Sequence, residues 1–223
     1  MNGLTAADYA DTGQWRLIVR IYLSGMSAFI ENTIHTDLEP QLLFSSEWEC
    51  EPDDLLNHIE NAVYDHPRVL DDFSARIIVF DPHTLFMPVS FNENGEGEDE
   101  DFYVAVYGGE PADVMTDSFG GILAAYSPVG GLKGFLSRTF PGARIECNLM
   151  EQLRRRRNGE GKRIFVTPRK NETDYLLFDG KEFLSGSTHP TPAAADVVYH
   201  AANILDVYDM PLDETTVIIC GGE

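Results

Sequence analysis

The order of the predicted elements is the strongest constraint on this fold, because one series of elements occurs twice along the chain. In the first copy, "WRLIVRIYL" places Leu17, Val19 and Ile21 on one face of a strand. The segments "SAFIEN" and "PQLLFSSEW" read as two further strands, a helix follows Asp54, and "RIIVF" is typical of a short buried strand. The order strand, strand, strand, helix, strand predicts a mixed α/β domain.

The same order returns near the C-terminus. The segments are "KRIFVTP", "TDYLLFDG" and "KEFLSG" as strands, "AAADVVYHAANILDVY" as a helix, and "TTVIICGG" as the last strand. One constant offset superposes the apolar stripes of the two helices, which pairs Leu55 with Val197, Ile59 with Ala201 and Val63 with Leu205. Apolar helix stripes also match by chance, but the ordered series favours an internal duplication.

Between the copies lies a segment of different character. Residues 93–101 carry six acids and two glycines, which predicts an extended, solvated loop. After it we expect strands at 101–108, 113–119 and 121–127, a helix at 129–140, a strand at 143–148 and a helix at 149–157. The stretch "RNGEGK" is the best boundary, so the predicted lobes are 1–157 and 158–223.

Composition excludes several classes of partner. The chain has 37 acidic and 16 basic residues and a net charge of -21, which disfavours nucleic acid and anionic lipid surfaces. No apolar run approaches the roughly 20 residues that span a bilayer, and the N-terminus has no signal-peptide pattern. Three widely spaced cysteines suit buried thiols in a reducing compartment. We therefore expect a cytoplasmic protein without a membrane span.

Other candidate chemistry is weak. The six histidines form no metal-binding motif, so no metal site is predicted. Ser185, Ser187 and His189 are neighbours in "LSGSTH", but no nucleophile elbow accompanies them, and a loop is the favoured interpretation. Residues 154–157 are four consecutive arginines that either bind phosphate or, as favoured here, form the solvated end of a helix.

Three stretches, "LIVRIYLSGMSAFIEN", "DPHTLFMPVSF" and "ILAAYSPVGGLKGFLSRTFPGARIECN", resemble a bacterial family of unknown function with an actin-like ATPase fold. That family is distantly similar to pilus-assembly and cell-division ATPase-like proteins. The resemblance implies two ribonuclease-H-like lobes with mixed sheets and a cleft between them. By comparison of the two copies, the second lobe is expected to be incomplete at the C-terminus.

The resemblance also implies where a nucleotide would bind. The first phosphate turn falls on "YLSGMS", where Ser24, Gly25 and Ser27 supply a turn and hydroxyls, and the adenosine turn falls on Gly221 and Gly222. However, the acid expected near Tyr22 is missing, and Pro168 removes a backbone donor from the second phosphate turn. We therefore expect no catalysis and no cofactor, and a role as a protein-binding or scaffold module. The alternative is a nucleotide-dependent switch that binds ATP and magnesium.

Overall fold

The structure is a computed structural model that describes residues 11–51, 54–92, 98–169 and 171–221. Internal contacts divide the chain into two compact units. One comprises Met1–Pro82 and Ser127–Asn148, and the other comprises His83–Tyr126 and Leu149–Glu223. The lobes predicted at 1–157 and 158–223 divide the chain by its sequence repeat, and that boundary stays a prediction.

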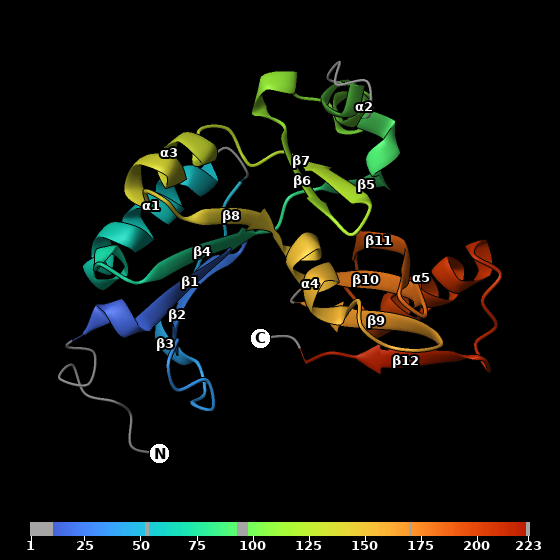
Figure 1. The fold of residues 1–223 in the computed structure, drawn as a ribbon. Coiled ribbons are helices and arrows are strands. Elements are labelled where there is room, and N and C mark those ends of the chain that lie inside the picture. The colour runs from blue at the N-terminus through green and yellow to red at the C-terminus, as the bar shows by residue number, and fades with distance from the viewer. Residues whose placement is uncertain (1–10, 52–53, 93–97, 170, 222–223) are drawn as a thin grey trace. The chain divides into compact units, whose positions relative to one another are not determined.

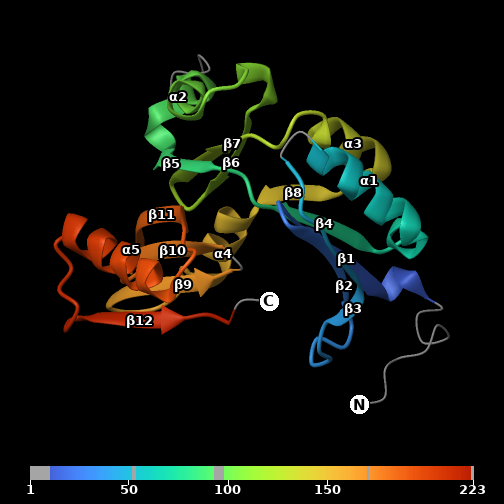
Figure 2. The same ribbon diagram turned by 180° about the vertical axis from the view of Figure 1, so that it is seen from behind.

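The first unit contains a five-stranded sheet in the order β3-β2-β1-β4-β8 (Figure 1). Its strands are β1 (Trp15–Tyr22), β2 (Gly25–Asn32), β3 (Gln41–Glu47), β4 (Ala75–Phe80) and β8 (Arg144–Cys147). β1, β2 and β3 form an antiparallel meander, and β4 runs parallel to both β1 and β8. The helices of this unit are α1 (Leu55–Asp65) and α3 (Leu132–Thr139), which lie on one face of the sheet (Figure 2).

The expected apolar stripe of α1 is confirmed. Leu55, Ile59 and Val63 are buried with Ala62, at the spacing that a helix needs to cover a sheet with one face. β1 is buried on both faces, since Ile18 and Val19 are both under a tenth exposed. This burial explains why the strand reads as a nearly continuous apolar run.

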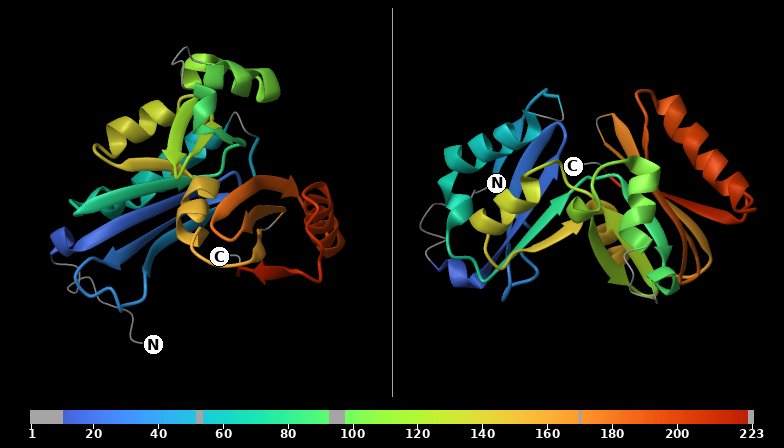
Figure 3. Two further views of the ribbon diagram at one scale, coloured as in Figure 1. Left: turned by 45° about the vertical axis from the view of Figure 1, so that its right-hand side comes forward. Right: turned by 90° about the horizontal axis from the view of Figure 1, so that it is seen from above.

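The second unit contains a four-stranded sheet in the order β11-β10-β9-β12. Its strands are β9 (Lys162–Pro168), β10 (Glu172–Asp179), β11 (Glu182–Pro190) and β12 (Thr215–Ile219). The helix α5 (Ala194–Val207) lies along one face, where Ile204 and Leu205 join Ile164 and Tyr175 in the core (Figure 3). β11 extends through Ser185, Ser187 and His189, so the loop expected there is wrong.

The two sheets share one topology. In each, a meander of three antiparallel strands leads through a helix to a strand that runs parallel to the first strand of the meander. Ile18 pairs with Ile77 in the first sheet and Ile164 pairs with Val217 in the second, at corresponding positions. The middle strand of each meander also has a register irregularity at nearly the same place, after Ala28 and after Leu177.

The second unit also holds a three-stranded sheet in the order β5-β7-β6. Its strands are β5 (Thr84–Pro88), β6 (Met115–Phe119) and β7 (Ile122–Tyr126), and α4 (Asn148–Arg156) belongs to the same unit apart from its first residue. The strands expected at 113–119 and 121–127 and the helices expected at 129–140 and 149–157 are therefore present.

The segment after the acidic run differs from the prediction. The strand expected at 101–108 is wrong, because α2 (Glu98–Tyr107) is a helix that begins inside the acidic run. Tyr103 packs with Met87 and Val114, and Asp99, four residues earlier, is 1% exposed. The part of the expected acidic loop at 93–97 lies outside the described residues, and the part at 98–101 is helical.

No helix in the described part of the chain is long and apolar enough to cross a membrane. All three cysteines are free thiols. Cys147 is buried as expected, whereas Cys50 and Cys220 are half-buried.

Candidate functional site

The first hairpin turn is where the resemblance places a phosphate loop. Tyr22 pairs with Gly25, so Leu23 and Ser24 form a two-residue connection between β1 and β2. The backbone N–H of Trp48 donates to the Ser24 carbonyl (3.0 Å), and its indole N–H donates to the Leu23 carbonyl (2.9 Å). The chain that leaves β3 therefore covers this turn.

The glycine of this turn has a packing role. A Cβ atom on Gly25 would lie 2.7 Å from the Ser46 carbonyl oxygen, closer than real Cβ contacts allow. A glycine in a strand often marks such a close approach of a neighbouring backbone. The glycine at position 25 is thus explained by the close contact between β2 and β3.

The remaining predicted site residues lie in different settings. Ser27 lies within β2, is 9% exposed, and pairs with Arg20 on β1 and Ser45 on β3. Gly221 follows β12 in the other unit, and no atom would lie within 4 Å of a Cβ there. Gly222 is outside the described residues. Ser24 and Gly25 therefore share one hairpin, Ser27 is inside a strand, and Gly221 belongs to a separate unit.

The second hairpin turn connects β9 to β10 and is closed by its own groups. Pro168 ends β9 without a backbone N–H, and the N–H of Arg169 donates to the Glu172 carbonyl (2.7 Å). The Arg169 guanidinium lies 2.7 Å from Asp174 and 3.5 Å from the carboxylate of Glu172. The positive charge of Arg169 is thereby paired with two acids at the start of β10.

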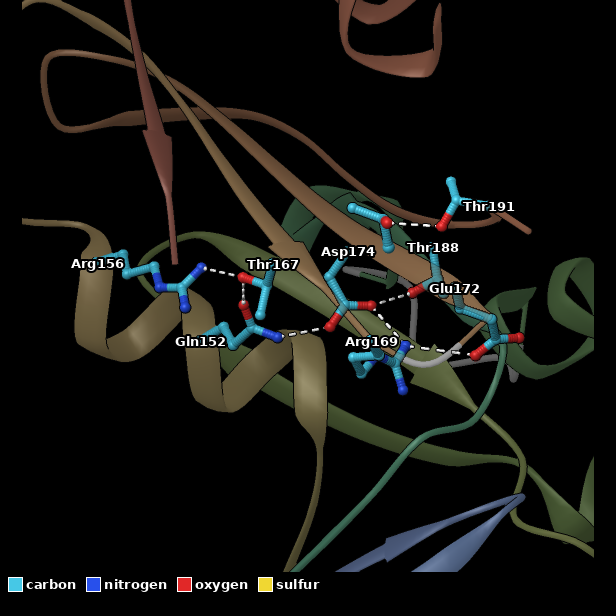
Figure 4. Close-up of polar contacts among 9 residues, drawn as sticks. Gln152, Arg156, Thr167, Arg169, Glu172, Asp174, Thr188 and Thr191 are labelled. Carbon is cyan, nitrogen blue, oxygen red and sulfur yellow. Dashed lines mark hydrogen bonds and ion pairs between the residues drawn. The ribbon is translucent and has the colours of Figure 1, made fainter. Parts of the chain in front are cut away.

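Asp174 is the centre of a buried polar cluster (Figure 4). It is 1% exposed, and its carboxylate accepts hydrogen bonds from Gln152 Nε2, Arg169 Nη2 and Thr188 Oγ1, each at 2.7 Å. Charge-assisted bonds of this kind are stronger than neutral ones. Donors from α4, from the turn between β9 and β10, and from β11 hold this carboxylate in place.

Three polar residues form a row across the sheet. Asp174 on β10 is directly opposite Thr167 on β9 and Thr188 on β11. Gln152 of α4 reaches two members of the row, since its carbonyl accepts from Thr167 Oγ1 (3.1 Å) while its amide donates to Asp174. We call Gln152, Thr167, Arg169, Asp174 and Thr188 the polar row.

Arg156 extends the polar row at the other end of α4. Its guanidinium donates to Thr167 (2.9 Å) and lies over the Phe165 ring, 5.2 Å from the ring centre. Burial lowers the pKa of Arg156 from its ordinary value, and nearby acidic groups oppose that shift. The side chain nonetheless stays cationic at neutral pH, because the ordinary pKa of arginine is so high.

The other arginines of the run are also committed to contacts within the unit. Arg154 lies 2.5 Å from Asp117 of β6, Arg155 pairs with Glu151, and Arg157 lies over the Phe119 ring. The interpretation of 154–157 as a solvated helix end holds for Arg155, whose side chain is 59% exposed, and is wrong for Arg154, Arg156 and Arg157, which are half-buried. Arg154, Arg156 and Arg157 attach α4 to the two sheets of its unit.

The corresponding row in the first sheet is mainly apolar. The shared strand registers match Thr167, Asp174 and Thr188 with Ile21, Met26 and Ser46. Ile21 is 2% exposed and Met26 is 1% exposed. The first sheet thus has no carboxylate at the position that Asp174 occupies in the second.

Sequence reasoning missed the polar row. One signal was present, since Asp174 is a charged residue inside the otherwise apolar run of β10, and such a residue requires partners when buried. The identity of those partners was not readable, because Gln152 is distant in sequence and on a different element.

The sequence and the fold are both similar to those of known proteins. A family model described as a protein of unknown function (DUF3822) matches residues 6–222. The chain belongs to this family. No curated protein matches the sequence.

Solved structures that are similar to this chain include the following two. The first is a Bacteroides thetaiotaomicron protein with an actin-like ATPase fold and unknown function, at 18% identity and a TM-score of 0.81, covering 99% of this chain and 86% of that one. The second is the cytoplasmic domain of EpsL, an inner membrane component of the type II secretion system of Vibrio cholerae. It has 10% identity and a TM-score of 0.52, and the match covers 94% of this chain and 84% of that one. These likenesses show the fold, and the predicted actin-like ATPase fold in a family of unknown function is confirmed.

Proposed function

We propose that this protein is a non-catalytic, cytoplasmic protein-binding or scaffold module built on an actin-like ATPase fold. The observation that carries the proposal is the state of the two hairpin turns that would hold phosphates. In the second turn, Arg169 and Asp174 bond to each other, which opposes binding of phosphate by the arginine or of magnesium by the acid.

The first turn supports the same proposal. Ile21 and Tyr22 occupy the end of β1, where a magnesium-binding acid is expected, and Gly25 is required by its contact with Ser46. A nucleotide triphosphate would also bring about four negative charges to a chain that already has a net charge of -21. Both effects disfavour tight nucleotide binding.

The proposed protein-binding role has support from the fold family. EpsL, which shares the fold, is a component of a secretion system and thus of a protein assembly. We infer a role in a protein assembly for this chain by analogy of fold. Fold alone does not establish a function, so the proposal also requires residues that form an interface. The proposal includes an internal duplication, which the shared topology of the two large sheets supports.

A thermal-unfolding series with ATP and magnesium tests the absence of nucleotide binding. A ligand at 100 times its Kd stabilises the native state by about 2.7 kcal/mol, so bound ATP would raise the melting temperature visibly. We expect no rise above a control with magnesium alone. A saturable rise, or ATP turnover well above that of a Tyr22→Ala, Ser24→Ala double variant, would favour the nucleotide-dependent switch instead.

A further inference from the structure

The helix α2 has apolar side chains on a flank that is exposed. Its opposite flank is buried, because Tyr103 packs against Met87 and Leu123 of the three-stranded sheet (Figure 1). Phe102 and Val106 are nevertheless 44% and 51% exposed. Residues four apart lie on one face of a helix, so these two side chains form a single exposed stripe.

A third apolar side chain extends this stripe beyond the helix. Phe91 belongs to the short 3-10 helix η4 (Val89–Asn92), is 38% exposed, and contacts Phe102 with ring centres 5.3 Å apart. We call Phe91, Phe102 and Val106 the apolar patch. Single exposed apolar residues are ordinary on a protein surface, whereas a contiguous patch with a polar rim is typical of a binding surface.

The charges around the apolar patch have one sign. Residues 83–126, which include the β5-β7-β6 sheet and α2, contain nine acids and neither lysine nor arginine. The helix α2 packs against β7, η4 and the 3-10 helix η5 (Pro111–Asp113), all of which belong to this segment. Asp101, Glu110 and Asp113 are exposed acids of the same segment.

The basic side chains that reach this segment from α4 do so at β6. Arg154 pairs with Asp117, and Arg157 lies over the Phe119 ring, whereas the apolar patch lies on α2 and η4. Within α2, a hydrogen bond between Glu100 and its neighbour Asp99 raises the pKa of Glu100 from its ordinary value. The acids of α2 therefore interact with one another, and a cation brought beside them would be attracted.

This charge also decides which kind of protein can cover the patch. A second copy of the chain would bring the same nine acids to the contact and would be repelled. The patch runs along a helix, and the exposed flank of a helix is a ridge against which the side chains of a second helix can pack. An amphipathic helix with basic residues meets both requirements.

We propose that the apolar patch binds an amphipathic helix of a partner protein, with the partner's apolar face on Phe91, Phe102 and Val106 and its lysines or arginines beside the acids of residues 83–126. The apolar contact supplies affinity, and the acids select a basic partner and speed its association. This inference rests on the proposed protein-binding function and assigns it a surface.

The test uses the 223-residue chain and a synthetic peptide of about 18 residues, long enough to form a helix, with leucines at helical spacing on one face and lysines elsewhere. We expect saturable binding by fluorescence anisotropy, weaker binding as salt is raised, and slower amide exchange in α2 when the peptide is added. Replacing the lysines of the peptide with glutamate should abolish binding. Absence of saturable binding, or unchanged exchange in α2, would overturn the proposal.

Two matched substitutions show whether the peptide uses the apolar patch. Val106→Gln places an amide in the patch and should weaken peptide binding at least about fivefold. Val198→Gln makes the same change at a valine of α5 that is 68% exposed, and should leave the affinity within about twofold. Equal effects of the two substitutions would contradict the proposal, and so would a dimer of the chain that Val106→Gln dissociates.

The acids are tested by a second matched pair. Asp101→Asn on α2 should slow association of the peptide about twofold at low salt, whereas Asp206→Asn, at an exposed acid of α5, should not. An equal slowing by both would show that only the overall charge of the chain attracts the peptide, which would contradict selection at this surface.

The exchange measurement on the unaltered chain remains decisive if Val106→Gln does not fold. Failure of this inference is also distinguishable from failure of the proposed function. Stabilisation by ATP would contradict the non-catalytic module whatever the peptide does, whereas absence of peptide binding without an ATP effect would remove only the α2 surface.

Discussion

At the scale of single residues, Gly25 distinguishes a packing requirement from a phosphate-binding one. Gly25→Ala places a methyl group against the Ser46 carbonyl, and we expect it to lower the free energy of unfolding by about 1–3 kcal/mol. Gly130→Ala is the matched control, because nothing lies within 4 Å of a Cβ there and its φ is not positive. Urea unfolding measures both, and equal stability of the two variants would contradict the packing explanation.

Asp174 gives a second prediction at this scale. Asp174→Asn removes the charge that Gln152, Arg169 and Thr188 share, and its amide donates where the carboxylate accepted. We expect a loss of about 2–4 kcal/mol in the free energy of unfolding, since Arg169 loses the nearer of its two acidic partners inside the protein.

The control for this variant is Asp179→Asn, an exposed acid at the end of the same strand, which should change stability by less than about 0.5 kcal/mol. Chemical denaturation of the three proteins under one set of conditions gives the comparison. A similar small effect of both substitutions would mean that the polar row contributes little to the stability of the second unit.

At the scale of elements, β11 and α5 are joined by a pair of histidines. His189 of β11 stacks on His200 of α5 with ring centres 4.4 Å apart, and its Nε2 lies 3.1 Å from Ser187 Oγ. Burial lowers the pKa of His189 from its ordinary value, and the charge of His200 lowers it further. The native state therefore favours the neutral form of His189.

This shift predicts a pH dependence with a definite sign. Between the lowered folded pKa and the unfolded pKa of about 6.5, the unfolded chain binds more protons. The free energy of unfolding should thus fall as the pH falls below about 6.5. His189→Phe should reduce that slope, whereas His35→Gln, at an exposed position, should leave it unchanged. Urea unfolding at several pH values from about 5.5 to about 7.5, which spans the titration of histidine, measures the slopes.

Elements also show what the sequence could and could not predict. The repeated meander, its helices and the final strands were readable because apolar periodicity is a local signal. The helix α2 could not be predicted in this way, because the alternating Phe102, Val104 and Val106 suggest a strand. In the structure it is Tyr103 that makes the buried contact. The acids at the start of α2 were the missed signal, since negative charge is favourable in the first turn of a helix.

The candidate site was less predictable than the fold for a physical reason. A hairpin turn can be predicted from sequence, but whether its polar groups are free to bind a ligand depends on contacts from distant segments. Trp48 covers the first turn, and Gln152 reaches the second from α4. These contacts form only when the sheets and helices pack together, so Ser24 and Gly25 could be placed on a turn while its surroundings could not be foreseen.

At the scale of the whole molecule, the net charge of -21 leads to a last prediction. Excess charge of one sign opposes the compact state by self-repulsion, and salt screens it, with a Debye length of about 8 Å at 0.15 M. We therefore expect the melting temperature to rise as sodium chloride is increased from about 0.02 M to about 0.3 M, and to level off beyond that as screening saturates. A rise that stays linear to high salt would indicate a general salting-out effect instead. A fall would mean that attractive pairs such as Lys162 and Glu214 outweigh the repulsion among the 37 acids.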